Sequence, residues 1–65
     1  MTPAAFKAAR NRLGLSAASL GAILNVNERT VRKWEQEGQA RPPNAIACRV
    51  LEWMLEGYRP PQWPS

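Results

Sequence analysis

Residues 16–36 read SAASLGAILNVNERTVRKWEQ, and this stretch decides the fold. Ser16 is a good N-cap residue, and apolar residues recur at helical spacing after it, which predicts a short helix up to Leu24. Asn25 follows, and asparagine adopts the left-handed conformation of a tight turn more readily than most residues other than glycine. Asn27 is a strong N-cap for a second helix. The stretch therefore predicts two short helices joined by a turn.

The second of these helices, taken as residues 28–36, has an apolar side and a polar side. At about 100° per residue, Val31 and Trp34 fall together on one side of the helix. A polar face is often only solvated, but arginine and lysine also suit guanine edges and phosphates. The opposite side carries two arginines, a lysine and two hydrogen-bonding residues: Glu28, Arg29, Arg32, Lys33 and Gln36.

Two further residues fit the geometry of a helix-turn-helix. That motif needs a small residue where its two helices cross and an apolar residue that points inward from the turn. Gly21 and Val26 stand at those places. In such a motif the first helix braces against the DNA backbone and the second lies in the major groove. We therefore expect residues 16–36 to form a helix-turn-helix.

The segment SAASLGAILNVNERTVRKWE resembles the Cro and lambda-repressor-like helix-turn-helix family. The resemblance covers residues 4–56 and includes AARNRLGL before the segment and the pair Pro42 and Pro43 after it. Family members commonly carry glycine at the position of Asn25, and glutamine at that of Ala17, where the side chain touches a phosphate. Alanine there implies a weaker contact, made only by the N-terminus of the first helix of the motif.

The resemblance also implies a role for each polar residue. Arg29 and Arg32 are the best candidates for contacting bases, and Lys33 would face bases or nearby phosphates. Glu28 would either accept a hydrogen bond from cytosine or, as we favour, orient Arg32 one turn along the helix. The remaining residues expected at DNA cap a helix or reach flanking phosphates and the minor groove: Ser16, Ala17, Asn27, Gln36, Gln39 and Arg41.

Arg10 and Glu35 are expected to have a structural role instead. Each borders the apolar side of its helix, where a charged group needs a partner. In similar repressors an arginine of the first helix and a glutamate of the third form a partly buried ion pair, and Arg10 and Glu35 match those positions. The resemblance therefore implies an ion pair between them.

The last expected helix runs from Pro43 or Asn44 to Glu56, with Gly57 as its stop. Its apolar residues spread over about 200°, whereas a helix that packs only within its own domain needs a little over ~100°. The surplus predicts either a homodimer interface or a tail, residues 58–65, that folds back over the helix. The residues expected in the interface are Leu51, Met54, Leu55, Tyr58 and Trp63.

Composition narrows the function classes. The chain has 65 residues, a net charge of +4, one cysteine and no histidine. Because Cys48 is alone and histidine is absent, no disulfide and no metal site are expected. No enzymatic activity or cofactor is expected either, since no carboxylate pair has an obvious cleft, and the chain has no room for a domain that senses a small-molecule ligand. The basic excess suits a polyanion, although many basic small proteins bind no nucleic acid. With no apolar N-terminal run and no membrane-length segment, we expect a cytoplasmic protein that does not engage a membrane.

The sequence thus predicts an all-α fold of four helices, or five. It comprises a helix-turn-helix domain over 1–57 and a Pro/Trp-rich tail over 58–65. The resemblance implies a sequence-specific regulator that binds double-stranded DNA. The expected form is a dimeric repressor on a palindromic operator, as in a phage or plasmid autoregulator, an antitoxin or an anti-CRISPR-associated repressor. The alternative is a small helical protein–protein interaction module that uses the last helix and the tail.

Overall fold

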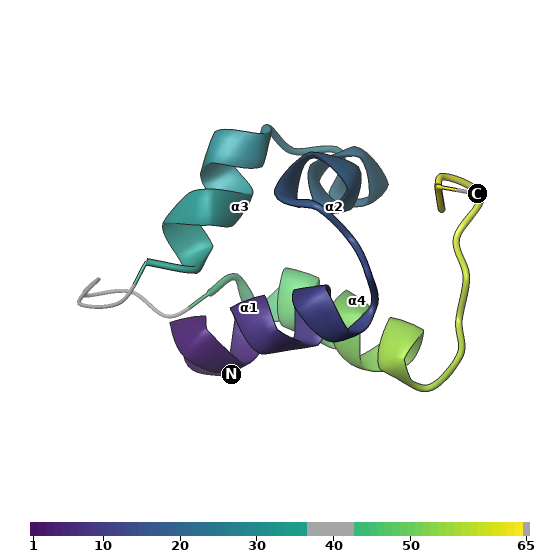
Figure 1. Ribbon diagram of the computed structural model, residues 1–65, viewed down its shortest axis with the longest axis horizontal. Helices are drawn as coiled ribbons and strands as arrows, with labels where there is room; N and C mark the ends of the chain where they lie inside the picture. Colours follow the sequence, from purple (N-terminus) through teal and green to yellow (C-terminus); the bar gives the residue numbers. More distant parts are fainter. Residues whose placement is uncertain (37–42, 65) are drawn as a thin grey trace.

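The computed structural model describes residues 1–36 and 43–64. Within these ranges the chain forms four helices and no strand: α1 (Pro3–Arg12), α2 (Ala17–Leu24), α3 (Glu28–Trp34) and α4 (Ala45–Leu55). The predicted all-α class is confirmed, with four helices in the described ranges. Figure 1 shows two layers, with α2 and α3 lying over α1 and α4.

Every helix begins at a side chain that caps it. Thr2, Ser16, Asn27 and Asn44 each accept a hydrogen bond from a backbone N–H group in the first turn of the following helix. These N–H groups have no partner within the helix, so a cap of this kind typically contributes about 1 kcal/mol. The predicted starts of the two helices in residues 16–36 are therefore confirmed.

The turn between α2 and α3 is tight because of Asn25 and Gly21. Asn25 is left-handed, with φ of 58° and ψ of 44°. The backbone N–H of Val26 donates to the carbonyl oxygen of Gly21 at 2.8 Å. A Cβ atom on Gly21 would lie 2.7 Å from the carbonyl oxygen of Val26, too close for any side chain without movement. Glycine is therefore needed where α2 meets the turn, and this close approach sets the position of α3.

The core lies between the two layers and receives side chains from all four helices. The rings of Phe6 and Trp34 pack edge to face, with centroids 5.9 Å apart, and join α1 to α3. The largest fully buried side chains are Phe6, Leu20, Val31, Leu51 and Met54.

Leu51 and Met54 do not lie at the surface, where the sequence predicts a dimer interface. Both side chains are 0% exposed in the core of their own chain, so this part of the interface prediction is wrong. The apolar arc of α4 is too wide for its spacing alone to reveal which part faces α1. Of the other residues predicted there, Leu55 is 38% and Tyr58 50% exposed.

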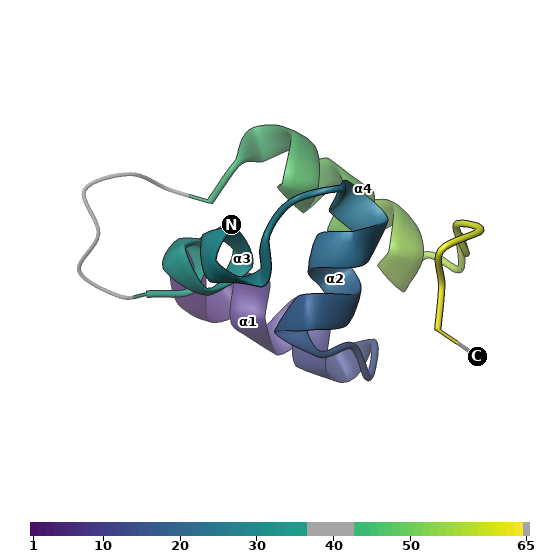
Figure 2. The ribbon, with the colours of Figure 1, turned by 90° about the horizontal axis from the view of Figure 1, so that it is seen from above.

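After α4 the C-terminal tail lies beside the domain (Figure 2), but Trp53 stays 49% and Leu55 38% exposed, so the tail does not account for the apolar surplus of α4. Pro60 is buried and Trp63 packs, half-buried, against the core. The N–H of Trp63 donates to the carbonyl oxygen of Pro60 at 3.0 Å, so the segment makes a tight turn and is not extended throughout. Arg59 donates to the carbonyl oxygen of Met54 at 2.8 Å, and its guanidinium lies 4.2 Å from the centroid of the Trp63 ring.

Replacement of Trp63 by alanine is expected to lower the free energy of unfolding by about 1–2 kcal/mol, since both apolar burial and a cation–π contact are lost. The matched control is Tyr58→Ala in the same tail, because Tyr58 is 50% exposed; its change should stay below about 0.5 kcal/mol. Urea unfolding at low protein concentration, followed by circular dichroism, measures both. Identical midpoints for the two variants would show that the docked tail adds no stability.

Candidate nucleic-acid interface

The orientation of α3 is fixed by its apolar side. Val31 is fully buried and Trp34 is half-buried against the core. The polar side therefore faces solvent, where Arg29, Arg32 and Lys33 are all exposed. Three cations thus stand on one short, outward-facing helix, as the helical spacing predicts. The helix ends at Trp34, two residues earlier than predicted, so Gln36 lies beyond it.

Glu28 and Arg32 form an ion pair along the exposed side of α3. Arg32 Nη2 lies 3.1 Å from Glu28 Oε2, with side chains 68% and 45% exposed. An ion pair this open to water contributes little stability. The ion pair instead sets the direction of the Arg32 side chain, because Glu28 holds its guanidinium along the helix. In this exposed position the guanidinium can exchange Glu28 for another hydrogen-bond acceptor.

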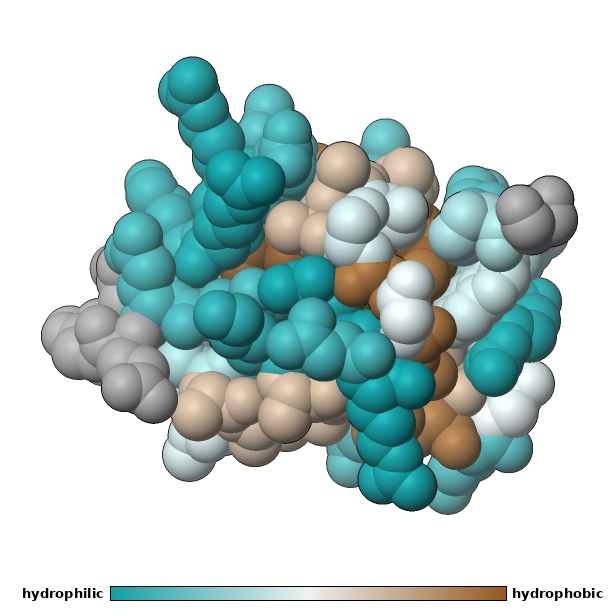
Figure 3. Space-filling model, in the orientation of Figure 1, coloured by the Kyte–Doolittle hydropathy of each residue, from teal (hydrophilic) through white to brown (hydrophobic). Residues whose placement is uncertain are grey.

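An open hollow of about 400 Å³ lies where α1, the start of α2 and α3 come together. Four of the residues predicted at DNA gather here from two different parts of the chain. In Figure 3 hydrophilic side chains gather over α3 and in a band across α1. The lining residues are Lys7, Arg10, Ser16, Ala17, Arg32, Glu35 and Gln36.

Lys7 was not predicted from the sequence to belong to this region. It lies on α1, three residues before Arg10, and is exposed at the hollow. The only signal in the sequence is that residues three apart share a helix face, so Lys7 lies on the same side of α1 as Arg10. Its position adds a cation to those supplied by α3.

Arg10 and Glu35 meet at the edge of the hollow as a two-pronged ion pair. Arg10 Nε donates to Glu35 Oε2 at 2.6 Å, and Nη2 donates to Oε1 at 2.9 Å. Nη1 also donates to the carbonyl oxygen of Leu15 at 2.9 Å. The hydrogen bonds that Arg10 donates to Glu35 raise the pKa of Arg10, while burial opposes that rise. This one guanidinium joins α1, the segment before α2 and the end of α3, as the resemblance implies.

The start of α2 lines the hollow with two small residues, Ser16 and Ala17, and not with a long side chain. Ser16 Oγ accepts from the N–H of Ser19 at 3.0 Å. Ala17 as a whole residue is only 7% exposed, so it offers little surface to a ligand. Asn27 is occupied in a similar way, because its Oδ1 accepts from the N–H of Arg29 at 2.8 Å.

Gln39 and Arg41, which the sequence predicts at DNA, lie outside the described residues. Cys48 is buried at 8% exposure in α4. Over 1–36 and 43–64 no three acidic, cysteine or histidine residues gather as metal ligands, and no helix has the length and apolar character needed to cross a membrane.

Neither a protein-family model, nor a curated protein, nor a solved structure matches this chain.

Proposed function

We propose that this protein is a sequence-specific regulator that binds double-stranded DNA through a helix-turn-helix, in the manner of the Cro and lambda-repressor-like family it resembles. The observation that carries the proposal is the cationic face of α3. Arg29, Arg32 and Lys33 are exposed there, while burial of Val31 fixes which side of the helix points outward. As a repressor, the protein acts by occupying an operator.

The dimensions of α3 support this role. A helix of seven residues rises about 10 Å, and the major groove of B-DNA, about 12 Å wide, admits a helix. Arginine can donate two hydrogen bonds to the edge of a guanine, which is the commonest specific base contact. Arg29 and Arg32 are the groups for that role, and Lys33 suits a phosphate as a point charge.

The hollow beside α3 supports a contact with the DNA backbone. Lys7 brings a positive charge to its rim, and Ser16 and Ala17 at the start of α2 also line it. A strand leaving the groove would pass this rim, where phosphates meet a cation and a helix N-terminus. The predicted affinity therefore falls steeply as salt rises, because bound counterions are released from the DNA.

A short helix contacts few base pairs, so we propose that two copies bind a palindromic operator with their α3 helices about 34 Å apart. Selection from random duplex DNA tests this form directly. The expected result is an enriched sequence with two inverted half-sites. An enriched sequence with one half-site would support DNA binding and refute the dimeric form.

Arg32→Ala is expected to weaken binding to the selected duplex by about tenfold to a hundredfold, equivalent to the ~1–3 kcal/mol of a bidentate base contact. It should also relax the preference at one base pair of each half-site. Lys7→Ala should instead weaken all sequences alike. Fluorescence anisotropy with labelled duplexes measures both effects.

The matched control for these variants is Arg12→Ala, which removes an equally charged, exposed side chain of α1 that does not line the hollow. Its affinity should stay within about twofold of the wild type. Failure to enrich any sequence, together with binding that is indifferent to salt, would refute the proposed function. A protein-interaction module would give that outcome.

A further inference from the structure

The outer side of α4 carries large apolar side chains that no part of the described chain covers. Ile46 is 75% and Trp53 49% exposed, and Val50 between them is half-buried. These three residues are spaced four and three apart, so they form one continuous line along the helix, called here the outer stripe. Tyr58, 50% exposed, follows just beyond the C-terminal end of α4.

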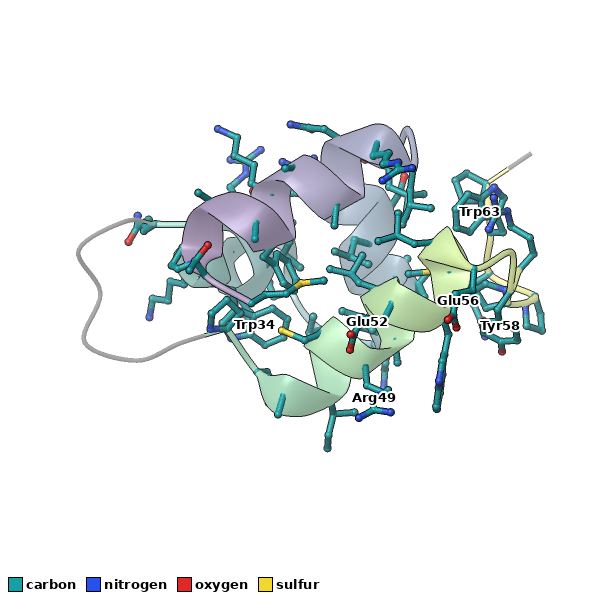
Figure 4. All side chains as sticks on the ribbon, turned by 90° about the horizontal axis from the view of Figure 1, so that it is seen from below. Trp34, Arg49, Glu52, Glu56, Tyr58 and Trp63 are labelled. Atoms are coloured by element: carbon teal, nitrogen blue, oxygen red, sulfur yellow. The ribbon has the colours of Figure 1, made fainter. Side chains whose placement is uncertain are left out.

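A charged edge runs beside the outer stripe. Figure 4 shows Arg49, Glu52 and Glu56 on the same side of α4. Arg49 Nε lies 3.8 Å from Glu52 Oε1, and these side chains are 69% and 58% exposed, so their ion pair is loose. The edge is positive in the N-terminal half of the helix and negative in the C-terminal half. Charges arranged in this order complement an identical helix that runs in the opposite direction.

We propose that the outer stripe and its charged edge bind a second copy of this chain, with the two α4 helices antiparallel about a two-fold axis. This inference deepens the proposed function, and its biological role rests on it, because a palindromic operator requires two copies. The interface itself involves only α4 and Tyr58. None of the cations of α3 takes part, so their faces stay open in both copies.

The register of the pair follows from the charges. In a two-fold interface, if one residue contacts another, the reciprocal contact also occurs. When the axis passes between positions 52 and 53, Arg49 faces Glu56 of the second copy, and the reverse. The same register places Trp53 beside the axis and brings Ile46 near Tyr58 of the second copy. A parallel two-fold pair would instead place the two charged edges on opposite sides of the interface, where Arg49 could not meet Glu56 of the second copy.

The size of this surface indicates the strength of the pair. A standard interface buries about 800 Å² on each partner, roughly a sixth of the 4486 Å² surface of this chain. A patch built on one helix of eleven residues and Tyr58 lies at or below that size. We therefore expect a dimer that dissociates at micromolar concentrations, held mainly by the central Trp53, since tryptophan is enriched among residues that dominate interfaces.

Charge reversal tests the register. Sedimentation equilibrium of the full chain without DNA is expected to show a monomer–dimer equilibrium. Arg49→Glu and Glu56→Arg should each weaken self-association by about tenfold or more, and the double variant should restore it, because like charges become opposite again. Arg12→Glu is the matched control, since it makes the same charge change on α1. Trp53→Ser should abolish the dimer while circular dichroism shows the helices intact.

Three results would overturn the inference: a wild-type monomer at every concentration measured, association that ignores Arg49 and Trp53, or a double variant as weak as the single ones. A monomer that still selects a DNA sequence would refute this interface and leave the proposed function standing. A dimer with the expected charge dependence, found together with a failure to select any DNA sequence, would support this interface and refute the proposed function. A monomer whose outer stripe binds a different protein would also refute this interface.

Discussion

Glu35→Ala is expected to destabilise the fold by about 3–5 kcal/mol, because removal of one partner leaves the other charge unpaired and largely shielded from water. The Arg10 side chain is only 12% exposed, and it would lose both of its hydrogen bonds to the carboxylate. A 65-residue domain has a stability of about 3–10 kcal/mol, so this loss approaches the whole. Thermal unfolding followed by circular dichroism should show a midpoint lower by at least about 12 °C.

The matched control is Glu28→Ala, which also removes a glutamate from an arginine but does so at the surface. The pair of Glu28 and Arg32 is 45% and 68% exposed, so its loss should cost less than about 0.5 kcal/mol. Glu35→Gln keeps one acceptor for Arg10 and should fall between the two. Equal melting midpoints for Glu35→Ala and Glu28→Ala would contradict the structural role of the partly buried pair of Arg10 and Glu35.

The same ion pair predicts how stability responds to alkaline pH. Because the pKa of Arg10 is raised in the folded state, its contribution is present below the ordinary arginine pKa and is lost only as pH rises through the still higher folded value. The stability difference between wild type and Glu35→Ala should therefore stay constant between about pH 7 and about pH 10. A difference that shrinks over this range would show that Arg10 loses its proton early.

Gly21→Ala is expected to destabilise the protein by about 2 kcal/mol or more, although alanine is the better helix former by ~1 kcal/mol. The new Cβ would lie 2.7 Å from the carbonyl oxygen of Val26 and 3.4 Å from the backbone nitrogen of Glu28. Both are backbone atoms, so the clash cannot be relieved by rotation of a side chain. The first residue of α3 must move instead, and DNA binding should weaken even where the variant remains folded.

Two controls separate this clash from ordinary glycine effects. Gly14 has a φ of 73° but nothing within 4 Å of its Cβ position, so Gly14→Ala should cost only the ~1–2 kcal/mol of a left-handed alanine. Ala22→Gly, at an exposed position of α2, should cost the ~1 kcal/mol of helix propensity alone. Urea midpoints compare the three variants. A Gly21→Ala protein as stable as the wild type would refute the close approach.

The parts of the fold that depend on neighbouring residues could be predicted from the sequence. The N-caps at Ser16 and Asn27 and the left-handed Asn25 are short-range features, and each lies where its residue type indicates. The outward face of α3 also follows from the sequence, because Val31 and Trp34 are its large apolar residues and both lie on the side that packs against the core. The pairing of Arg10 with Glu35, which are 25 residues apart, was implied only by the family resemblance.

The parts that depend on tertiary packing could not be predicted. The apolar residues of α4 cover too wide an arc for spacing alone to separate the buried Met54 from the exposed Trp53. The packing of α1 against α4 makes that choice, and this contact has no local signature. Lys7 was missed for a related reason, since a single lysine on α1 gains meaning only when folding brings it near Arg32 and Gln36.

The three tryptophans occupy different environments, and this makes the chain a set of optical reporters. Trp34 contacts Phe6 beside the core, so its fluorescence should follow unfolding. Trp53 is exposed to solvent on α4, and its fluorescence emission should shift to shorter wavelength when a second copy covers that surface. Trp63 lies under the guanidinium of Arg59 and should respond when the C-terminal segment detaches. Variants that retain one tryptophan each would let unfolding, association and detachment be timed separately in the same small protein.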